Sequence, residues 1–243
     1  MCRAASRLFS LVLLLFAGLT VSFTHEARAT GPGIKLAIKL DTATRFDLIN
    51  AAIKWVDYRG RHALHIVPLP GHEQAQNEMM MAVLTDSDFR DGVIELDVAG
   101  ARRAGYSTVE DVRGFKGVIG VSFRVDGDKF ETFYIRPENS RLNNQLYRNR
   151  TTQYESLPDF PWNRLRDESD GKYESYADLE PGAWARLRIE VSGVKARLYV
   201  NGAAQPCLVV NDLKNGDGHG KIALYTRVST DAYFANLKVE PAP

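Results

Sequence analysis

Two carboxylates, Glu95 and Asp97, stand two residues apart in a stretch that alternates apolar and acidic residues, 93–98. In an extended strand the side chains at i and i+2 point to the same face, so the two carboxylates are expected side by side. Retaining glycoside hydrolysis uses two carboxyl groups that are about 5 Å apart. The pair is therefore a candidate for acid–base chemistry or for hydrogen bonding to a sugar.

Other polar side chains alternate in the same way on two further stretches. By this alternation, the sheet face opposite the core is expected to carry Glu95, Asp97, Ser122, Arg124, Thr132, Tyr134 and Arg136. A tyrosine ring can stack on a sugar ring, and the charged groups can bond its hydroxyls. We therefore predict ligand contacts at Glu95, Asp97, Arg124, Tyr134 and Arg136. The alternative is cross-strand ion pairing on a solvated face.

The elements that position these residues have the period of strands. Alternating stretches cover residues 55–58, 63–67, 93–98, 117–125, 130–136, 185–191, 195–200, 221–226 and 233–239. Glycine turns such as Asp126-Gly127-Asp128, Ser192-Gly193 and Asn201-Gly202 separate several of them. Short strands without a long helical stretch predict an all-β, antiparallel two-sheet sandwich.

Two stretches break the alternation. Residues 72–81 fit a short helix or a loop, and residues 139–181 are polar, without periodicity. The second stretch predicts one long polar loop excursion, of a length that is often functional. Trp162 lies in it, and an aromatic side chain beside a groove suits polysaccharide binding. We predict Trp162 as a ligand contact; the alternative is that it pins the loop to the body. Whether the excursion covers the groove stays open.

Five segments, taken in order, carry a family resemblance. They are residues 89–98, 120–124, 134–137, 182–191 with 196–202, and 220–224 with 234–239. Together they resemble the concanavalin A-like lectin/glucanase superfamily, whose jelly roll is shared with laminin-G-like domains, over residues 53–239. The resemblance implies a jelly-roll sandwich. It implies little about activity, because this fold hosts lectins, hydrolases and adhesion modules.

Two enzyme families of this superfamily give more specific expectations. In its family-sixteen glycoside hydrolases, two catalytic Glu flank an Asp on one strand; Glu95 and Asp97 match the first two positions. Ala99 or Gly100 stands where the second Glu should be, so that mechanism lacks its general acid. Phe123-Arg124 is similar to a strand of the bacterial 3-keto-disaccharide hydrolase domain, although residues 119–121 depart from its usual Asn-Ser-Gly.

The first thirty residues have the pattern of a targeting segment. Arg3 and Arg7 precede an apolar run over residues 8–21, and Ala27-Arg28-Ala29 forms a small-x-small site. This pattern predicts a signal peptide over residues 1–29 and one jelly-roll domain over 30–243. The apolar run is shorter than the ~20 residues of a spanning helix. We expect an exported protein, periplasmic or secreted, with no stable membrane insertion after cleavage.

The charge and the cysteine content limit which partners and cofactors are expected. The chain has 31 basic and 30 acidic residues, without a basic cluster, so nucleic acid is not an expected partner. Cys207, the one thiol left after cleavage, is expected to be a small buried hydrophobe. We expect no cofactor. Calcium stays open because of three acidic groups: Asp86 with Asp88, Asp126 with Asp128, and Asn211-Asp212 with Asp217.

The sequence therefore predicts an exported carbohydrate- or glycan-binding jelly roll that uses its concave sheet face. Two alternatives stay open. One is an exported sugar-active enzyme that resembles a 3-keto-glycoside hydrolase. The other is a laminin-G-like interaction module that recognises a protein partner through its loops. Substitutions on the sheet face distinguish binding there from binding through the loops.

Overall fold

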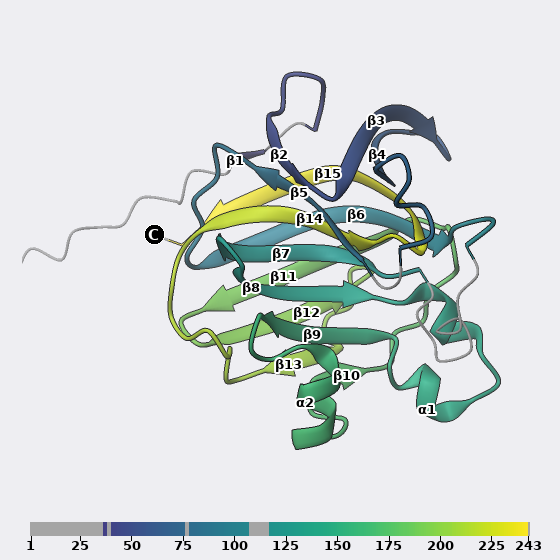
Figure 1. The fold of residues 1–243 in the computed structure, drawn as a ribbon. Helices are drawn as coiled ribbons and strands as arrows, with labels where there is room; N and C mark the ends of the chain where they lie inside the picture. The colour runs from purple at the N-terminus through teal and green to yellow at the C-terminus, as the bar shows by residue number, and fades with distance from the viewer. Residues whose placement is uncertain (1–35, 38–39, 76–77, 107–116, 243) are drawn as a thin grey trace, which may run out of the picture. The chain divides into compact units, whose positions relative to one another are not determined.

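Antiparallel strands dominate the computed structural model, which describes residues 36–37, 40–75, 78–106 and 117–242 (Figure 1). One sheet, called sheet A, has the strand order β13 (Leu208–Val210), β12 (Lys195–Val200), β11 (Ala185–Ser192), β6 (Gly92–Arg102), β15 (Thr230–Pro241), β4 (Arg61–Pro68) and β3 (Ala51–Tyr58), with β1 (Leu36–Ala37) also on β15. Sheet B has the order β10 (Glu174–Ser175), β9 (Thr152–Leu157), β8 (Lys129–Ile135), β7 (Ile119–Asp126), β14 (Lys221–Arg227), β5 (Met79–Leu84) and β2 (Phe46–Ile49). Three short helices lie on the β8–β10 connections: η2 (Pro137–Arg141), α1 (Gln145–Arg148) and α2 (Trp162–Glu168).

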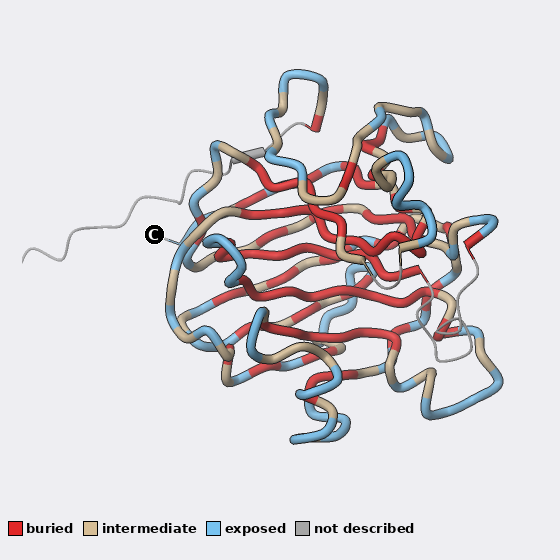
Figure 2. Tube along the Cα trace, in the orientation of Figure 1, coloured by how far each residue is buried: buried red, intermediate tan, exposed pale blue. Residues whose placement is uncertain are grey.

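The two sheets face each other and enclose one apolar core. In β11 the residues Leu187, Ile189 and Val191 are buried, whereas Arg186 and Arg188 point away from the core. Matching positions on the other strands complete the core, among them Leu96, Val98, Phe123, Phe133, Leu224 and Phe234. In Figure 2 the buried segments follow the strands of both layers. The predicted antiparallel two-sheet sandwich is confirmed.

The predicted hairpins are also present. β3 pairs with β4, β7 with β8, and β11 with β12. Asn201 follows β12 with a φ of 53°, a left-handed conformation that asparagine tolerates better than most residues. Its side-chain oxygen accepts a hydrogen bond from the Arg186 N–H at 3.0 Å, which joins this turn to β11.

The sequence predicted an irregular polar stretch over residues 139–181, but part of this stretch forms strands. It contributes β9, which pairs along its whole length with β8, and the short β10. Thr152, Tyr154 and Ser156 point to the core side, while Gln153 and Glu155 point to the other, and all five are buried. Both faces of β9 are polar, so the apolar alternation of an ordinary half-buried strand is missing. Residues 79–81, expected as helix or loop, likewise begin β5.

No helix in the described part of the chain is long and apolar enough to cross a membrane. The predicted signal peptide, residues 1–29, lies outside the described residues.

Candidate functional site

The side chains of sheet B that point away from the core form a second buried layer, called here the sheet B face. Its central row runs in register through Gln153, Tyr134, Gly120, Tyr225 and Met81. Tyr134 is 1% exposed and Tyr225 is fully buried. Around the two tyrosines an apolar cluster separate from the main core includes Met81, Val83, Val118, Val125, Phe130 and Ala223. Sheet B is therefore buried on both faces.

Gly120 allows the two tyrosines of this row to meet. A Cβ at Gly120 would lie 2.1 Å from the carbonyl oxygen of Phe133 and 2.6 Å from the Cα of Tyr134. The rings of Tyr134 and Tyr225, from the strands on either side of Gly120, stack with centroids 5.8 Å apart. Burial raises the pKa of both phenols well above the ordinary value of tyrosine, so both hydroxyls stay protonated and can donate.

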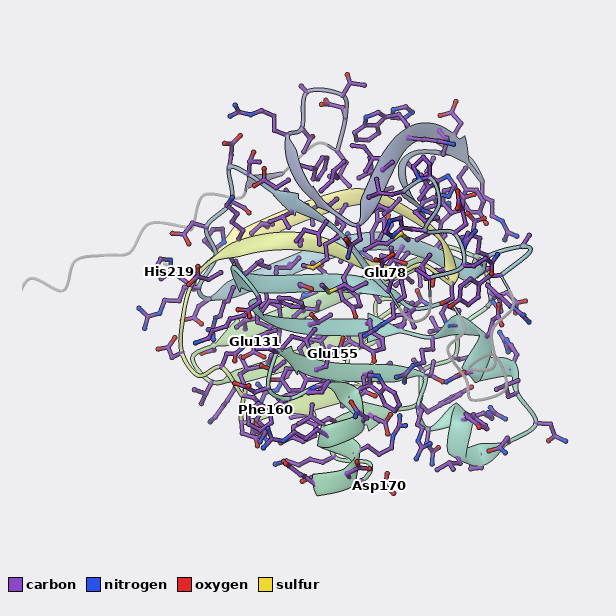
Figure 3. The ribbon with its side chains drawn as sticks, viewed as in Figure 1. Glu78, Glu131, Glu155, Phe160, Asp170 and His219 are labelled. Atoms are coloured by element: carbon purple, nitrogen blue, oxygen red, sulfur yellow. The ribbon has the colours of Figure 1, made fainter. Side chains whose placement is uncertain are left out.

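Glu155 is a fully buried carboxylate on the sheet B face (Figure 3). One carboxylate oxygen accepts hydrogen bonds from the Tyr225 hydroxyl at 2.7 Å and from an Arg227 guanidinium N–H at 3.2 Å. The other accepts the backbone N–H of Trp162 at 3.3 Å. Trp162 is the first residue of α2, so this bond holds α2 against β9. A buried carboxylate requires such partners, since an unpaired one would cost several kcal/mol.

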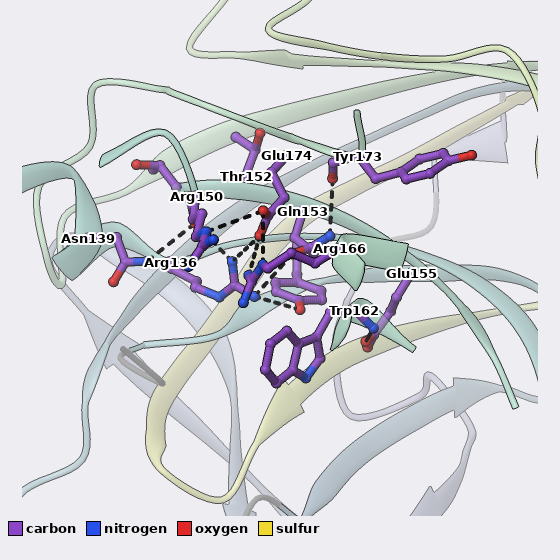
Figure 4. Close-up of polar contacts among 12 residues, drawn as sticks. Arg136, Asn139, Arg150, Thr152, Gln153, Glu155, Trp162, Arg166, Tyr173 and Glu174 are labelled. Atoms are coloured by element: carbon purple, nitrogen blue, oxygen red, sulfur yellow. Dashed lines mark hydrogen bonds and ion pairs between the residues drawn. The ribbon is translucent and has the colours of Figure 1, made fainter. Parts of the chain in front are cut away.

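Arg136 links the sheet B face to a second charged group (Figure 4). Its Nη2 donates to the Tyr134 hydroxyl at 2.9 Å and to Gln153 Oε1 at 3.3 Å. Its Nη1 donates to the carbonyl of Arg150 at 2.8 Å and lies 3.7 Å from Glu174 Oε1. The side chains of Arg136 and Glu174 are each only 4% exposed. These contacts leave Arg136 little rotamer freedom, so the site is preorganised.

A pocket of about 390 Å³ opens beside this network at the edge of sheet B. It is called here the β10 pocket, and its lining includes Asn149, Arg150, Asp170, Glu174, Ser175 and Tyr176. Tyr176 is 37% exposed, and its hydroxyl accepts a hydrogen bond from Arg148 at 3.1 Å. The pocket has the volume of a small-ligand site, and it combines one accessible aromatic ring with charged and amide groups.

The structure brings together three of the six predicted ligand contacts. Tyr134 and Arg136 are hydrogen-bonded, and Trp162 is linked to Arg136 through Arg166, which also bonds Glu174, the partner of Arg136 (Figure 4). The Arg166 guanidinium stacks on the Trp162 ring, 4.5 Å from its centroid. This stacking lies within α2, whereas the backbone N–H of Trp162 bonds Glu155 and so holds the start of α2 against β9.

Glu95 and Asp97 do not share a face with Tyr134, and that prediction is wrong. They lie on β6 in sheet A, where they alternate with the core residues Ile94, Leu96 and Val98, and point away from sheet B. The nearest cations on their own sheet bind them: Arg186 lies 3.2 Å from Glu95, and Arg61 lies 2.6 Å from Asp97. This is the cross-strand ion pairing of the alternative interpretation. β6 and β8 have the same alternation of apolar and polar residues but belong to different sheets. The alternation of a strand does not indicate which sheet the strand joins.

Arg124 does not lie on the sheet B face either. A β-bulge interrupts the pairing of β7 after Phe123, and Arg124 has a φ of 54°. The bulge turns the guanidinium to the end of the sandwich. There it donates to the carbonyls of Arg90, Gly193 and Gly216 at 2.8–2.9 Å and to Asp91 at 3.0 Å. Arg124 thus joins three loops of the protein.

Sequence reasoning missed several members of the site: Gln153, Glu155, Arg166, Glu174, Tyr225 and Arg227. Glu155 and Glu174 fell in the stretch that was expected to be irregular. Tyr225 and Arg227 alternate with the core residues Ile222 and Leu224 at the end of β14. The alternation of β14 was the one signal available for them, since it places Ala223, Tyr225 and Arg227 on one face.

Four of the six aspartates considered for calcium pair with basic side chains. Asp86 pairs with Arg45, Asp88 with His219, Asp212 with Lys172 and Lys214, and Asp217 with Arg90. Asp126-Gly127-Asp128 spans the β7–β8 turn, where Gly127 has a φ of 61°. Within the described ranges, no group of three or more His, Cys, Asp or Glu side chains is arranged to hold a metal ion.

The pairing of Asp212 predicts a contribution to acid stability. Burial opposes its ionisation, but hydrogen bonds from Lys172, Lys214 and Tyr173 outweigh this and lower the pKa of Asp212 from 3.8 to about 2. The folded state therefore favours the carboxylate. Its contribution is complete above about pH 4 and is lost as the pH falls toward 2. We expect Asp212→Asn to lower the free energy of unfolding at neutral pH by up to about 1 kcal/mol, because the pair is partly exposed.

Urea unfolding of the wild type and of Asp212→Asn between about pH 2 and pH 7 measures this contribution. The difference between the two proteins should shrink as the pH falls below 4. Asp178→Asn, which removes an exposed partner of Arg141, is the control and should change little. Parallel pH profiles for the wild type and Asp212→Asn would contradict the prediction.

Cys207 is a half-buried thiol that donates a hydrogen bond to the carbonyl of Leu198. Burial raises the pKa of this thiol to about 11, so it is protonated at neutral pH. A protonated thiol is a poor nucleophile, and Cys207 packs against the core.

Comparison with known proteins identifies the fold. No family model matches the chain, and no curated protein matches it in sequence. Among solved structures, the carbohydrate-binding module CBM66 from Bacillus subtilis aligns with a TM-score of 0.53 at 12% identity, covering 84% of this chain and all of that one. A protein of unknown function with a galectin-like fold, also from Bacillus subtilis, aligns with a TM-score of 0.51 at 12% identity, covering 80% of this chain and 88% of that one.

A third solved structure is the exoplasmic/lumenal domain of VIP36 in its Ca²⁺/Man-bound form. It aligns with a TM-score of 0.50 at 8% identity, and the alignment covers 81% of this chain and 83% of that one. At such identities the likeness concerns the fold. The fold is a two-sheet jelly roll, which is consistent with the concanavalin A-like fold that the sequence predicted.

Proposed function

We propose that this chain is an exported carbohydrate-binding protein whose ligand lies in the β10 pocket, against the sheet B face. One observation carries the proposal. The pocket opens beside an outer sheet face on which charged groups are buried and hydrogen-bonded, whereas the ion pairs of Glu95 and Asp97 on sheet A are partly solvated. Buried charges reduce stability unless they are fully paired, and their concentration in one place is typical of a functional site.

The chemistry of the pocket suits a sugar. A sugar ring has apolar C–H faces and a rim of hydroxyls, so it needs an aromatic surface together with planar hydrogen-bonding groups. Tyr176 offers a partly exposed ring, over one face of which the Arg148 guanidinium lies 5.0 Å from the centroid, and Asn149, Arg150 and Ser175 offer polar groups around it. Arg136 connects this pocket to Tyr134 and so stabilises the positions of the groups behind it. The structural neighbours include a carbohydrate-binding module and a mannose-bound domain, which supports the proposal.

The export part of the proposal depends on the targeting pattern of residues 1–29. The basic start, the short apolar run and the Ala27-Arg28-Ala29 site support it. The mature chain has an almost balanced net charge. Carbohydrate binding agrees with this, because it does not require attraction between the net charge of the protein and its ligand.

Tyr176→Ala tests the proposal directly. We expect the wild type to bind members of a glycan array, and Tyr176→Ala to weaken that binding by about tenfold. This corresponds to about 1.4 kcal/mol, near the upper end of what an aromatic stacking contact contributes. Tyr176 is accessible, so its loss should leave the fold intact. Isothermal titration calorimetry with the strongest glycan gives the affinity.

Tyr199→Ala is the matched control, because Tyr199 lies on the outer face of sheet A and bonds Glu190 there. It should bind like the wild type. Equal loss in both variants would argue against the β10 pocket. If the wild type bound no glycan, the carbohydrate proposal would fail and the interaction-module alternative would be favoured. Release of sugar from a bound glycan during the assay would indicate the enzymatic alternative.

A further inference from the structure

Three arginines converge on one glutamate behind the β10 pocket. Arg166 Nε donates to Glu174 Oε2 at 3.1 Å, and its Nη2 bonds the other carboxylate oxygen. Arg150 Nε lies 3.4 Å from Glu174 Oε2, and Arg136 Nη1 lies 3.7 Å from Oε1. One carboxylate can balance only one guanidinium charge. The group therefore carries an excess of positive charge at the base of the pocket.

Asp170, the other acidic residue that lines the pocket, offsets this positive charge only weakly. Asp170 Oδ1 is 3.7 Å from Arg150 Nη2, and its side chain is 72% exposed. An exposed pair at this distance contributes about 1 kcal/mol or less, so an anionic ligand can displace it. Arg150 itself is 18% exposed and lines the pocket. It is the cation of this group that a ligand in the pocket can reach.

Arg150 is held in place from behind. Its carbonyl accepts hydrogen bonds from Arg136 at 2.8 Å and from the Asn139 amide at 3.3 Å. Nearby, Arg148 Nε and Asn139 Oδ1 are buried polar atoms without a hydrogen-bond partner in the described part of the protein. Such atoms are uncommon in folded proteins, and an enclosed water would satisfy them.

We propose that the sugar bound in the β10 pocket is an acidic one, a uronic acid whose carboxylate pairs with the guanidinium of Arg150. The planar fork of arginine matches a carboxylate with two parallel hydrogen bonds. Tyr176 then faces the ring of the same sugar, and the carboxylate replaces Asp170 at Arg150. This inference rests on the proposed function and adds the class of glycan to it.

Calorimetry with three soluble polysaccharides tests the inference: polygalacturonate, dextran sulfate and dextran. We expect the wild type to bind polygalacturonate at least tenfold more tightly than dextran, with an affinity that falls as the salt concentration rises from about 50 to 200 mM. Arg150→Gln should lose that preference, and Arg150→Lys, which keeps the charge but not the fork, should keep part of it. Arg164→Gln removes an exposed arginine of α2 that pairs with Glu168, so it matches the change in net charge and should behave like the wild type.

Each other outcome has a defined meaning. Binding of dextran as tight as that of polygalacturonate overturns the acidic-sugar inference and leaves the carbohydrate proposal standing. Polyanion binding that Arg150→Gln and Arg164→Gln weaken to the same extent also overturns it, since the attraction would then depend only on net charge. Binding of none of the three polymers, together with an empty glycan array, would overturn the proposed function itself. Thermal unfolding of each variant confirms that it is folded.

Discussion

Gly120→Ala is expected to lower the free energy of unfolding by about 3 kcal/mol or more. The added Cβ would lie 2.1 Å from a backbone oxygen of β8 and 2.6 Å from a backbone carbon of Tyr134. Backbone atoms in the middle of a paired strand cannot move aside as a flexible side chain can, so β7 and β8 would have to separate. Denaturant unfolding measures the loss.

Gly218→Ala is the matched control for this substitution. Nothing lies within 4 Å of the Cβ that it would add, and a change within about 0.5 kcal/mol is expected. A loss of similar size in both variants would show that the close approach at Gly120 is not the cause. Because Tyr134 lies directly across from Gly120, the Gly120 variant should also bind glycan more weakly wherever it remains folded.

Arg124→Met is expected to reduce stability by about 3–5 kcal/mol, the range found when one member of a buried ion pair is removed. The side chain of Arg124 is 4% exposed and donates to three carbonyls and one carboxylate. Its removal takes away the side chain that bonds all three carbonyls, and Asp91 keeps the hydrogen bond from the Gly193 N–H at 2.8 Å. Arg124→Lys should recover only part of the loss, since one ammonium group cannot reach all four positions.

The control for Arg124 is Arg186→Met. Arg186 also forms an ion pair, with Glu95 at 3.2 Å, but its side chain is half exposed. A loss of about 1 kcal/mol or less is expected there. Comparable losses at Arg124 and Arg186 in urea unfolding would contradict the structural role assigned to Arg124. Neither substitution touches the β10 pocket, so glycan binding by the folded fraction should be unchanged.

The fold was predictable from the sequence because most strands have one apolar and one polar face. β11 alternates Leu187, Ile189 and Val191 with charged residues. Glycine turns mark both ends of the strand β12, with which β11 forms a hairpin. β9 was not predictable in this way. Its core side holds Tyr154, whose hydroxyl donates to the buried Glu131 and accepts the Lys214 N–H. A strand whose polar groups are satisfied by distant residues looks like a loop in the sequence.

The candidate site was predictable only in part, for two physical reasons. Tyr134 and Arg136 follow the regular pleat of β8, so period two placed them correctly. Arg124 lies in a bulge, which takes its side chain out of the regular alternation of the strand. Glu174 and Arg150 meet because β10 pairs with β9, and short-range patterns contain no information about such pairing.

The position of β15 in sheet A has a consequence for the order in which the protein folds. β15 follows every other described strand in the chain, yet it lies between β6 and β4 and pairs with both. Until it is in place, each of these two strands has an unpaired edge that other chains can join. The sandwich can therefore be completed only after synthesis has passed residue 241. Contacts between strands so far apart in sequence make folding slow, and the unfinished chain has to be kept from aggregation for that time.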